Sequence, residues 1–145
     1  HGFMPIVVKV VEQEEYEEWV SVKKEEAQKL AELTTKEWTT EELVSRGQSV
    51  YEVNCVACHQ TNGQGIAGIF PALVGSDIVL NNKERNIEIL MEGVQGAAMN
   101  SFSYLSEVEI ASVITYTRQS WDNDKKGDGE VVVPKDIVDY KKPKI

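Results

Sequence analysis

The sequence predicts a small all-α domain of three to four helices, and three observations support this class. Apolar residues recur at helical spacing in separate stretches, and few stretches alternate apolar and polar residues as strands do. Two of these stretches follow a helix-start signal, at Thr39 and Ser106, where a hydroxyl residue precedes glutamates in the first turn. The two cysteines of the chain, Cys55 and Cys58, lie three positions apart after the first stretch.

The first helix of this domain begins after Thr39, and one of its faces is largely apolar. The residues that share this face are Leu43, Gly47, Val50 and Tyr51. Glycine in the middle of a helix is less stable than alanine, so we expect another helix to pack closely at Gly47.

Two more helices are expected beyond the cysteines. The second covers residues 82–93, and the third begins at Ser106 with an apolar stripe of Ile110, Val113, Ile114 and Thr117. A glycine-rich loop over residues 62–68 precedes them. It lacks the preceding strand and the following Lys-Ser or Lys-Thr of a phosphate-binding loop, so we expect its small residues to allow close backbone approach instead.

The charge of the chain argues against one class of partner. Its 145 residues include 24 acidic and 15 basic side chains, a formal net charge of −9. Phosphate binding needs clustered lysine and arginine, so we expect no nucleic-acid partner, whereas a basic protein partner is compatible with this charge. No apolar run approaches the roughly 20 residues that cross a bilayer, so we expect this chain to be soluble.

The cysteines and the next residue, His59, form the run Cys-Val-Ala-Cys-His. This spacing is typical of covalent c-type haem attachment, in which each thiol adds to one vinyl group and the histidine reaches the iron. With two Cys and two His in the chain, random placement gives this run roughly once in five thousand. The haem would also supply apolar surface to a domain of about 80 residues.

Three other interpretations of the cysteines remain open. A disulfide between Cys55 and Cys58 would close a very short loop and stabilise the fold little. A thioredoxin-like redox pair needs a βαβ setting, but a helical pattern precedes Cys55. A zinc site usually needs four ligands, and with His59 these residues supply three, leaving the distant His1 as a fourth.

An electron-transfer haem needs a second strong axial ligand. Met4 lies in an N-terminal strand before the haem domain, and Met91 has the helical spacing of a core residue. Met99 lies in a loop, 40 residues after His59, which is enough chain to reach the opposite face of the haem. We therefore predict Met99 as the ligand, whose thioether favours ferrous iron.

Residues 41–123 resemble a mono-haem cytochrome c domain. The whole chain resembles the C-terminal part of cytochrome c oxidase subunit II from the bacterial caa-type haem-copper oxidases, whose subunit II carries a fused cytochrome c domain. Three stretches carry this resemblance. The first is residues 1–11 with Tyr16 and Trp19, and the second is residues 55–59 with the Phe-Pro-Ala-Leu-Val-Gly-Ser of residues 70–76. The third is residues 114–121 with Gly127 and residues 133–137. Many cytochromes share the haem motif, and the terminal stretches narrow the resemblance to this family.

The resemblance implies a role for each site residue. One covalent haem c would be held by Cys55 and Cys58, with His59 and Met99 on the iron, and the carbonyl of Pro71 would accept the Nδ1 proton of His59. Many relatives have proline after the axial methionine, where this chain has Asn100, and glycine after the terminal tryptophan, where it has Asp122.

The N-terminal stretch resembles the end of a copper-binding cupredoxin domain, whose last ligands occur as His-x-x-Met before a strand. His1 and Met4 would be copper ligands only in the intact subunit. The bridging cysteines and the other histidine of that centre are absent from this chain, so we expect no copper here.

The implied function is electron transfer in aerobic respiration. Electrons would arrive from an upstream cytochrome or quinol-oxidising complex and leave to the dinuclear copper centre of the same subunit, among other oxidase subunits on the periplasmic or outer face of the bacterial cytoplasmic membrane. The chain would be a carrier without catalytic residues, and the intact complex would be cytochrome-c oxidase. A stand-alone soluble c-type cytochrome, a haem c peroxidase-like domain and a haemless redox or zinc module remain alternatives.

We expect four segments along the chain. Residues 1–11 would be the last strand of the copper domain, residues 41–123 the haem domain and residues 124–145 an extended tail. Residues 12–42 contain 11 Glu and 4 Lys, so residues 12–40 are expected to form an acidic linker, either an amphipathic helix or a solvated spacer. In isolation, residues 3–11 would pair with another copy or with residues 131–133.

Overall fold

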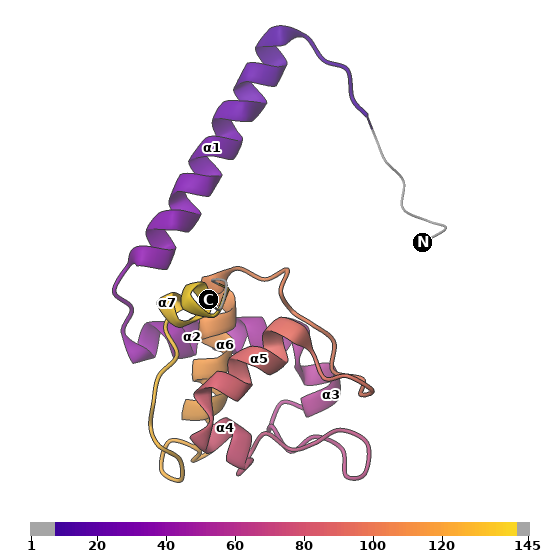
Figure 1. Cartoon of the computed structure of the whole chain (residues 1–145), viewed down its shortest axis with the longest axis vertical. Coiled ribbons are helices and arrows are strands. Elements are labelled where there is room, and N and C mark those ends of the chain that lie inside the picture. The colour runs from indigo at the N-terminus through magenta and orange to yellow at the C-terminus, as the bar shows by residue number, and fades with distance from the viewer. Residues whose placement is uncertain (1–7, 142–145) are drawn as a thin grey trace. The chain divides into compact units, whose positions relative to one another are not determined.

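The computed structural model describes residues 8–141. They divide along the chain into two compact units, one ending at Leu33 and the other beginning at Thr34. The first unit consists mainly of α1 (Gln13–Thr35), the indigo helix of Figure 1. None of its residues is buried. The acidic segment is therefore helical over most of its length, as its amphipathic pattern indicated.

The second unit is a set of helices gathered around α6 (Figure 1). They are α2 (Thr40–Asn54), α3 (Val56–His59), α4 (Asp77–Asn81), α5 (Lys83–Glu92), α6 (Glu107–Gln119) and α7 (Pro134–Lys141). Between residues 8 and 141 there is no strand, and the one β-bridge is an isolated pair, Ile66 with Phe70. The predicted all-α class is confirmed.

Capping boxes start the two longest helices of this unit. The hydroxyl of Thr39 accepts the backbone N–H of Glu42 at 3.2 Å, and the Glu42 carboxylate accepts the N–H of Thr39 at 3.0 Å. Ser106 and Glu109 make the same reciprocal pair at the start of α6. Each box satisfies N–H groups that have no partner inside the helix.

The closest helix contact joins α2 to α6 at Gly47. A Cβ atom on Gly47 would lie 2.0 Å from the carbonyl oxygen of Ser112 and 2.7 Å from the Cβ of Tyr116. These distances are far below van der Waals contact, so only glycine allows the two helices to cross this closely. The close packing expected at this position is confirmed.

The core lies on both sides of α6. One cluster contains Ile87 of α5, Ile110, Ala111 and Ile114 of α6, and Val132 and Ile137 from the C-terminal region. The other contains Val50 and Tyr51 of α2 with Val113 of α6. The stripe predicted on the third helix is thus buried against three different segments.

The C-terminal region differs from the extended tail that the sequence suggested. Residues 134–141 form α7, with Pro134 and Ile137 buried against α6. The hydroxyl of Thr115 accepts the N–H of Val132 at 3.0 Å and donates to its carbonyl at 2.8 Å. The expectation of an extended tail was wrong because apolar side chains of this region pack against the core. Local composition does not reveal such packing.

The predicted N-terminal strand lies largely outside the described residues, and so do His1 and Met4. Residues 8–11 form no strand, and Val8 and Val10 are exposed. A strand needs a neighbour for its backbone groups, and the described chain offers none here. Residues 8–11 do not pair with residues 131–133, and Thr115 already bonds both backbone groups of Val132. Pairing between two copies stays a prediction.

A buried guanidinium ties α6 to two distant segments. Arg118 donates from Nε to the carbonyl of Glu130 at 2.9 Å and from Nη1 to the carbonyl of Val79 at 2.7 Å, and its Nη2 pairs with Asp128. Burial raises the pKa of Asp128, but the N–H of Glu130 and the Arg118 charge outweigh it and hold that pKa below its usual value. The buried charge is therefore fully paired.

Replacing Gly47 by alanine tests the helix crossing. We expect Gly47→Ala to lower the free energy of unfolding of the haem-loaded protein by about 1–3 kcal/mol or more, because the methyl group must force the helices apart. Denaturant unfolding would measure this. Ser45→Ala, at an exposed position of the same helix, is the matched control and should change stability by less than about 0.5 kcal/mol. Equal effects of both variants would contradict the crossing.

The Arg118–Asp128 pair predicts a pH dependence of stability. Because the folded pKa of Asp128 is lowered, its stabilising effect is present above its unfolded pKa of about 3.9 and is lost as the pH falls through the folded pKa. We expect Asp128→Asn to reduce stability by about 1–2 kcal/mol at pH 7, less than for a fully buried pair. Wild type and variant should converge as the pH falls below about 4.

Unfolding measured from pH 7 to pH 3 would test this. Asp122→Asn is the control, since Asp122 pairs with Lys125 on the surface with both side chains more than half exposed. It should leave the pH profile almost unchanged. A wild-type advantage over Asp128→Asn that is as large at pH 3 as at pH 7 would contradict the assignment.

Candidate functional site

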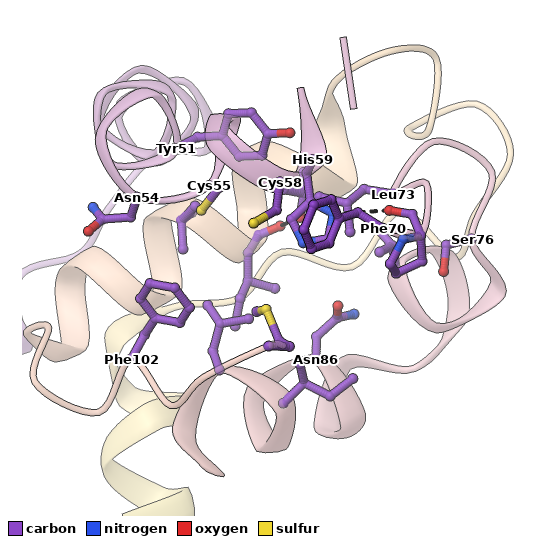
Figure 2. A pocket seen from close by; sticks show the side chains of 18 of the residues that line it. Tyr51, Asn54, Cys55, Cys58, His59, Phe70, Leu73, Ser76, Asn86 and Phe102 are labelled. Carbon is purple, nitrogen blue, oxygen red and sulfur yellow. Dashed lines mark hydrogen bonds between the residues drawn. The ribbon is translucent and has the colours of Figure 1, made fainter. Parts of the chain in front are cut away.

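One apolar cavity in the second unit gathers the predicted site residues (Figure 2). Cys55 lines it from the junction of α2 and α3, Cys58 and His59 from α3, and Met99 from the loop between α5 and α6. The remaining lining is largely apolar and includes Leu73, Val79, Leu90, Phe102, Leu105 and Val113. No lysine, arginine, aspartate or glutamate of the described chain lines it. The sequence-predicted residues are thus brought together, apart from His1 and Met4, which lie outside the described residues.

A tight junction of α2 and α3 positions the Cys-x-x-Cys-His run. The N–H of Cys55 donates to the carbonyl of Tyr51 at 2.8 Å, and the N–H of His59 donates to the carbonyl of Cys55 at 2.9 Å. The run therefore forms one turn of helix with both thiols and the imidazole on the cavity (Figure 2). Tyr51 also donates its hydroxyl to the carbonyl of Gln60 at 2.7 Å, which closes the turn on its far side.

Both cysteines are free thiols, and the disulfide interpretation finds no support. Burial and the neighbouring Cys58 raise the pKa of Cys55 to about 11. A thioredoxin-like nucleophile needs a lowered thiol pKa instead. No group of three or more Cys, His, Asp or Glu in residues 8–141 is arranged to hold a metal ion, so these side chains do not converge as zinc ligands would.

His59 is held in one orientation by the backbone that follows it. Its Nδ1 lies 3.0 Å from the carbonyl oxygen of Pro71, and since a carbonyl can only accept, Nδ1 carries the proton. In a neutral imidazole this leaves Nε2 without a proton and able to bind a metal. The side chain is 8% exposed.

Gly65 explains how Pro71 comes so close to the histidine. Its N–H donates to the carbonyl of His59 at 3.0 Å, and its φ of +62° is in the left-handed region. A Cβ atom on Gly65 would lie 2.3 Å from the carbonyl oxygen of Phe70 and 2.6 Å from that of Pro71. The glycine-rich loop therefore allows close backbone approach, as its small residues suggested.

Met99 reaches the cavity from a loop with internal hydrogen bonds. The N–H of Val94 donates to the carbonyl of Met99 at 2.9 Å, and the hydroxyl of Ser101 donates to the carbonyl of Met91 at 2.6 Å. Met91 itself packs against the core cluster around Ile110. Of the two described methionines, only Met99 lines the cavity.

One positioning residue was not evident from the sequence. Asn123 is fully buried, and its Oδ1 accepts the N–H of Gly75 at 2.9 Å. Its Nδ2 donates to the carbonyls of Thr117 at 2.9 Å and of Leu73 at 3.2 Å. It joins the loop after Pro71 to the end of α6. Two of its partners, Leu73 and Gly75, are far away in sequence, so no local pattern could have indicated this.

The residues present fit a covalently attached haem. Two free thiols and an imidazole lie together on one wall of an apolar cavity, and a thioether also lines it. Imidazole and thioether are a ligand pair typical of haem proteins that transfer electrons. The apolar lining suits the faces of a flat porphyrin. Fold and cavity together define a c-type cytochrome domain.

Comparisons with known proteins agree. The family model described as cytochrome c oxidase, cbb3-type, subunit III matches residues 42–116. Cytochrome c-552 of Thermus thermophilus is 36% identical over 97 residues, which cover 57% of this chain and 73% of that protein. The chain therefore belongs to the cytochrome c family, as a mono-haem domain like that of cbb3-type subunit III. It is an electron-transfer domain with a covalent haem c.

Two longer proteins are also similar over this domain. The cytochrome c subunit of the quinone alcohol dehydrogenase of Gluconobacter oxydans (strain 621H) is 29% identical over 92 residues, 56% of this chain and 19% of that subunit. The gluconate 2-dehydrogenase cytochrome c subunit of Pantoea cypripedii is 30% identical over 108 residues, 66% of this chain and 24% of that subunit. The chain thus spans a quarter or less of these relatives. No helix of the described residues is long and apolar enough to cross a membrane.

Proposed function

We propose that this domain passes electrons to the dinuclear copper centre of a cytochrome c oxidase subunit II, as part of the same subunit. The donor would be an upstream cytochrome or a quinol-oxidising complex. The main support is the cavity in which the thiols, His59 and Met99 meet. The resemblance of residues 1–11 and 133–137 to subunit II adds the oxidase context.

In this proposal Cys55 and Cys58 would hold the haem covalently, and His59 and Met99 would ligate its iron. When bound, the haem supplies a one-electron couple between ferric and ferrous iron. The carbonyl of Pro71 accepts the Nδ1 proton of His59, which fixes the tautomer and makes the imidazole a better ligand. The Met99 thioether and the apolar lining favour the ferrous state, because neither stabilises the extra positive charge of ferric iron.

The acidic helix α1 would connect this domain to the copper domain. Such a tether replaces a diffusing donor by one at high effective concentration. His1 and Met4 would complete the copper centre only with the residues of the intact subunit. The assembly would lie on the periplasmic or outer face of the bacterial cytoplasmic membrane, with the other oxidase subunits as partners.

A second candidate is electron transfer within a dehydrogenase complex. The similar cytochrome c subunits of alcohol and gluconate dehydrogenases favour it. It would use the same cavity and ligands but would receive electrons from a dehydrogenase subunit. A peroxidase-like role would instead require an open position on the iron, which a bound Met99 would occupy.

Replacing Met99 tests the ligand assignment. We expect the oxidised protein to show a weak iron–sulfur absorption band that Met99→Ala abolishes, together with a reduction potential lowered by on the order of 100 mV. Met91→Ala is the matched control, because its side chain packs in the core, and it should keep the band. A band that survives in Met99→Ala would contradict the assignment.

The same variant addresses the oxidase role when it is placed in the intact subunit II complex. Oxygen consumption driven by an upstream donor should fall, whereas consumption driven by a reductant that feeds the copper centre directly should not. Equal rates with the upstream donor for variant and wild type would contradict the oxidase proposal and favour the second candidate.

The hydrogen bond of Ser101 to Met91 predicts a positioning role for this serine in the Met99 loop. In Ser101→Ala the hydrogen bond that stabilises the loop is lost, at a net cost of about 1.4 kcal/mol. We therefore expect added imidazole to displace the Met99 thioether at about a tenfold lower concentration than in wild type. Titration of the iron–sulfur band with imidazole would measure it. Ser103→Ala is the control, because its hydroxyl bonds to that of Ser101 and, within residues 8–141, to no helix carbonyl. An unchanged titration for Ser101→Ala would contradict this role.

A further inference from the structure

Few buried side chains in the lining of the haem cavity carry polar atoms. Within residues 8–141 they belong to Tyr51, His59, Asn86 and Thr117. Three of the four are fully accounted for, because the hydroxyl of Tyr51, the imidazole of His59 and the hydroxyl of Thr117 each bond to a backbone carbonyl. Asn86, which is only 6% exposed, differs from them because one end of its amide has no partner in the described chain.

Two backbone carbonyls fix the orientation of the Asn86 amide. Its Nδ2 donates to the carbonyl of Ile78 at 2.8 Å and to that of Asn82 at 3.1 Å. A carbonyl can only accept, so the nitrogen and not the oxygen of the amide must face these two groups. Both hydrogens of the nitrogen are then in use. The amide cannot turn over without losing both bonds.

The oxygen of this amide faces the cavity without a partner. Within residues 8–141 no group donates a hydrogen bond to Oδ1 of Asn86, and Figure 2 shows the side chain pointing into the cavity. Joining α4 to α5 requires only the donors of the amide, whereas a buried acceptor without a partner is costly. The structural role of Asn86 therefore does not explain its oxygen.

We propose that Asn86 lowers the reduction potential of the haem by directing the negative end of its amide dipole into the cavity. This inference rests on the proposed attachment of haem there. Ferric iron carries one more positive charge than ferrous iron, so a fixed negative dipole end favours the ferric state. No charged side chain of the described residues lines the cavity, and in such apolar surroundings a single dipole acts strongly.

Asn86 thus opposes the Met99 thioether and the apolar lining, which favour ferrous iron. An electron carrier has to accept an electron and also to release it. If only the apolar surroundings set the potential, the reduced state would be stabilised further and release would become harder. The amide oxygen offsets part of this stabilisation and keeps the electron transferable.

Replacing Asn86 by leucine tests this role, because leucine has a similar size and no dipole. We expect Asn86→Leu to favour reduction of the haem-loaded protein about tenfold, which raises the midpoint potential by about 59 mV. A redox titration followed by the haem absorption bands would measure it. The iron–sulfur band of the oxidised protein should remain, because both iron ligands are unchanged.

Asn54→Leu is the matched control, because Asn54 lines the same cavity with both ends of its amide partnered. Its Nδ2 donates to the carbonyl of Val50 at 2.9 Å, and its Oδ1 accepts the hydroxyl of Tyr104 at 3.2 Å. We expect this variant to change the reduction equilibrium by less than about threefold, which is less than about 30 mV.

Asn86→Asp separates the effect of the oxygen from that of packing. At low pH the uncharged carboxyl group can donate its O–H to a backbone carbonyl and keep its other oxygen toward the cavity, so the potential should lie close to that of wild type. As the carboxyl group ionises between about pH 5 and about pH 9, its negative charge should lower the potential below that of wild type. A purely structural effect would not follow the pH in this way.

An unchanged or lower potential in Asn86→Leu would overturn the proposal, and so would an equal rise in Asn54→Leu. Loss of the iron–sulfur band in Asn86→Leu would also overturn it, because loss of a ligand would then explain the shift. If Asn86→Leu does not fold, a potential of Asn86→Asp that follows wild type at every pH overturns the proposal instead. A wild-type protein without covalent haem contradicts the proposed function, whereas a normal spectrum with an unchanged potential in Asn86→Leu contradicts only the role of Asn86.

Discussion

The close crossing of α2 and α6 at Gly47 determines where two parts of the lining of the haem cavity lie. From this crossing α2 continues to Tyr51 and then directly into the Cys-x-x-Cys-His turn, so its direction sets the position of both thiols. α6 contributes Val113 and Ile114 to the lining of the same cavity. A larger residue at the crossing would push α2 and α6 apart and so displace the lining residues that each helix positions. The same helix contact therefore determines both the packing of the fold and the geometry of the cofactor site.

The cavity is also part of the hydrophobic core. Leu90 and Leu105 pack against both core clusters and line the cavity as well. A bound haem would contact Leu90 and Leu105 and, through them, both core clusters. It would therefore link the cluster that contains α2 residues to the cluster that contains Val132 and Ile137. A group that binds only the folded state stabilises it, so folding and haem attachment support each other. This explains how a small domain with a large apolar cavity can be stable.

The sequence predicted what depends on local patterns. The capped helix starts at Thr39 and Ser106, the close contact at Gly47 and the Cys-x-x-Cys-His turn are all confirmed in the structure. It did not predict α7, because that helix is held by Val132 and Ile137 against a core that local composition does not show. The buried Asn123 was also missed, since its bonds to Leu73 and Gly75 join residues about 50 positions apart.

The proposed tether through α1 changes which step limits electron transfer. Opposite charges on two diffusing proteins mainly raise the rate at which they meet, and they do so across the water between them. A domain joined by α1 to its acceptor meets it by virtue of the connection, so attraction at long range adds little. What then limits transfer is how readily the two faces touch and separate.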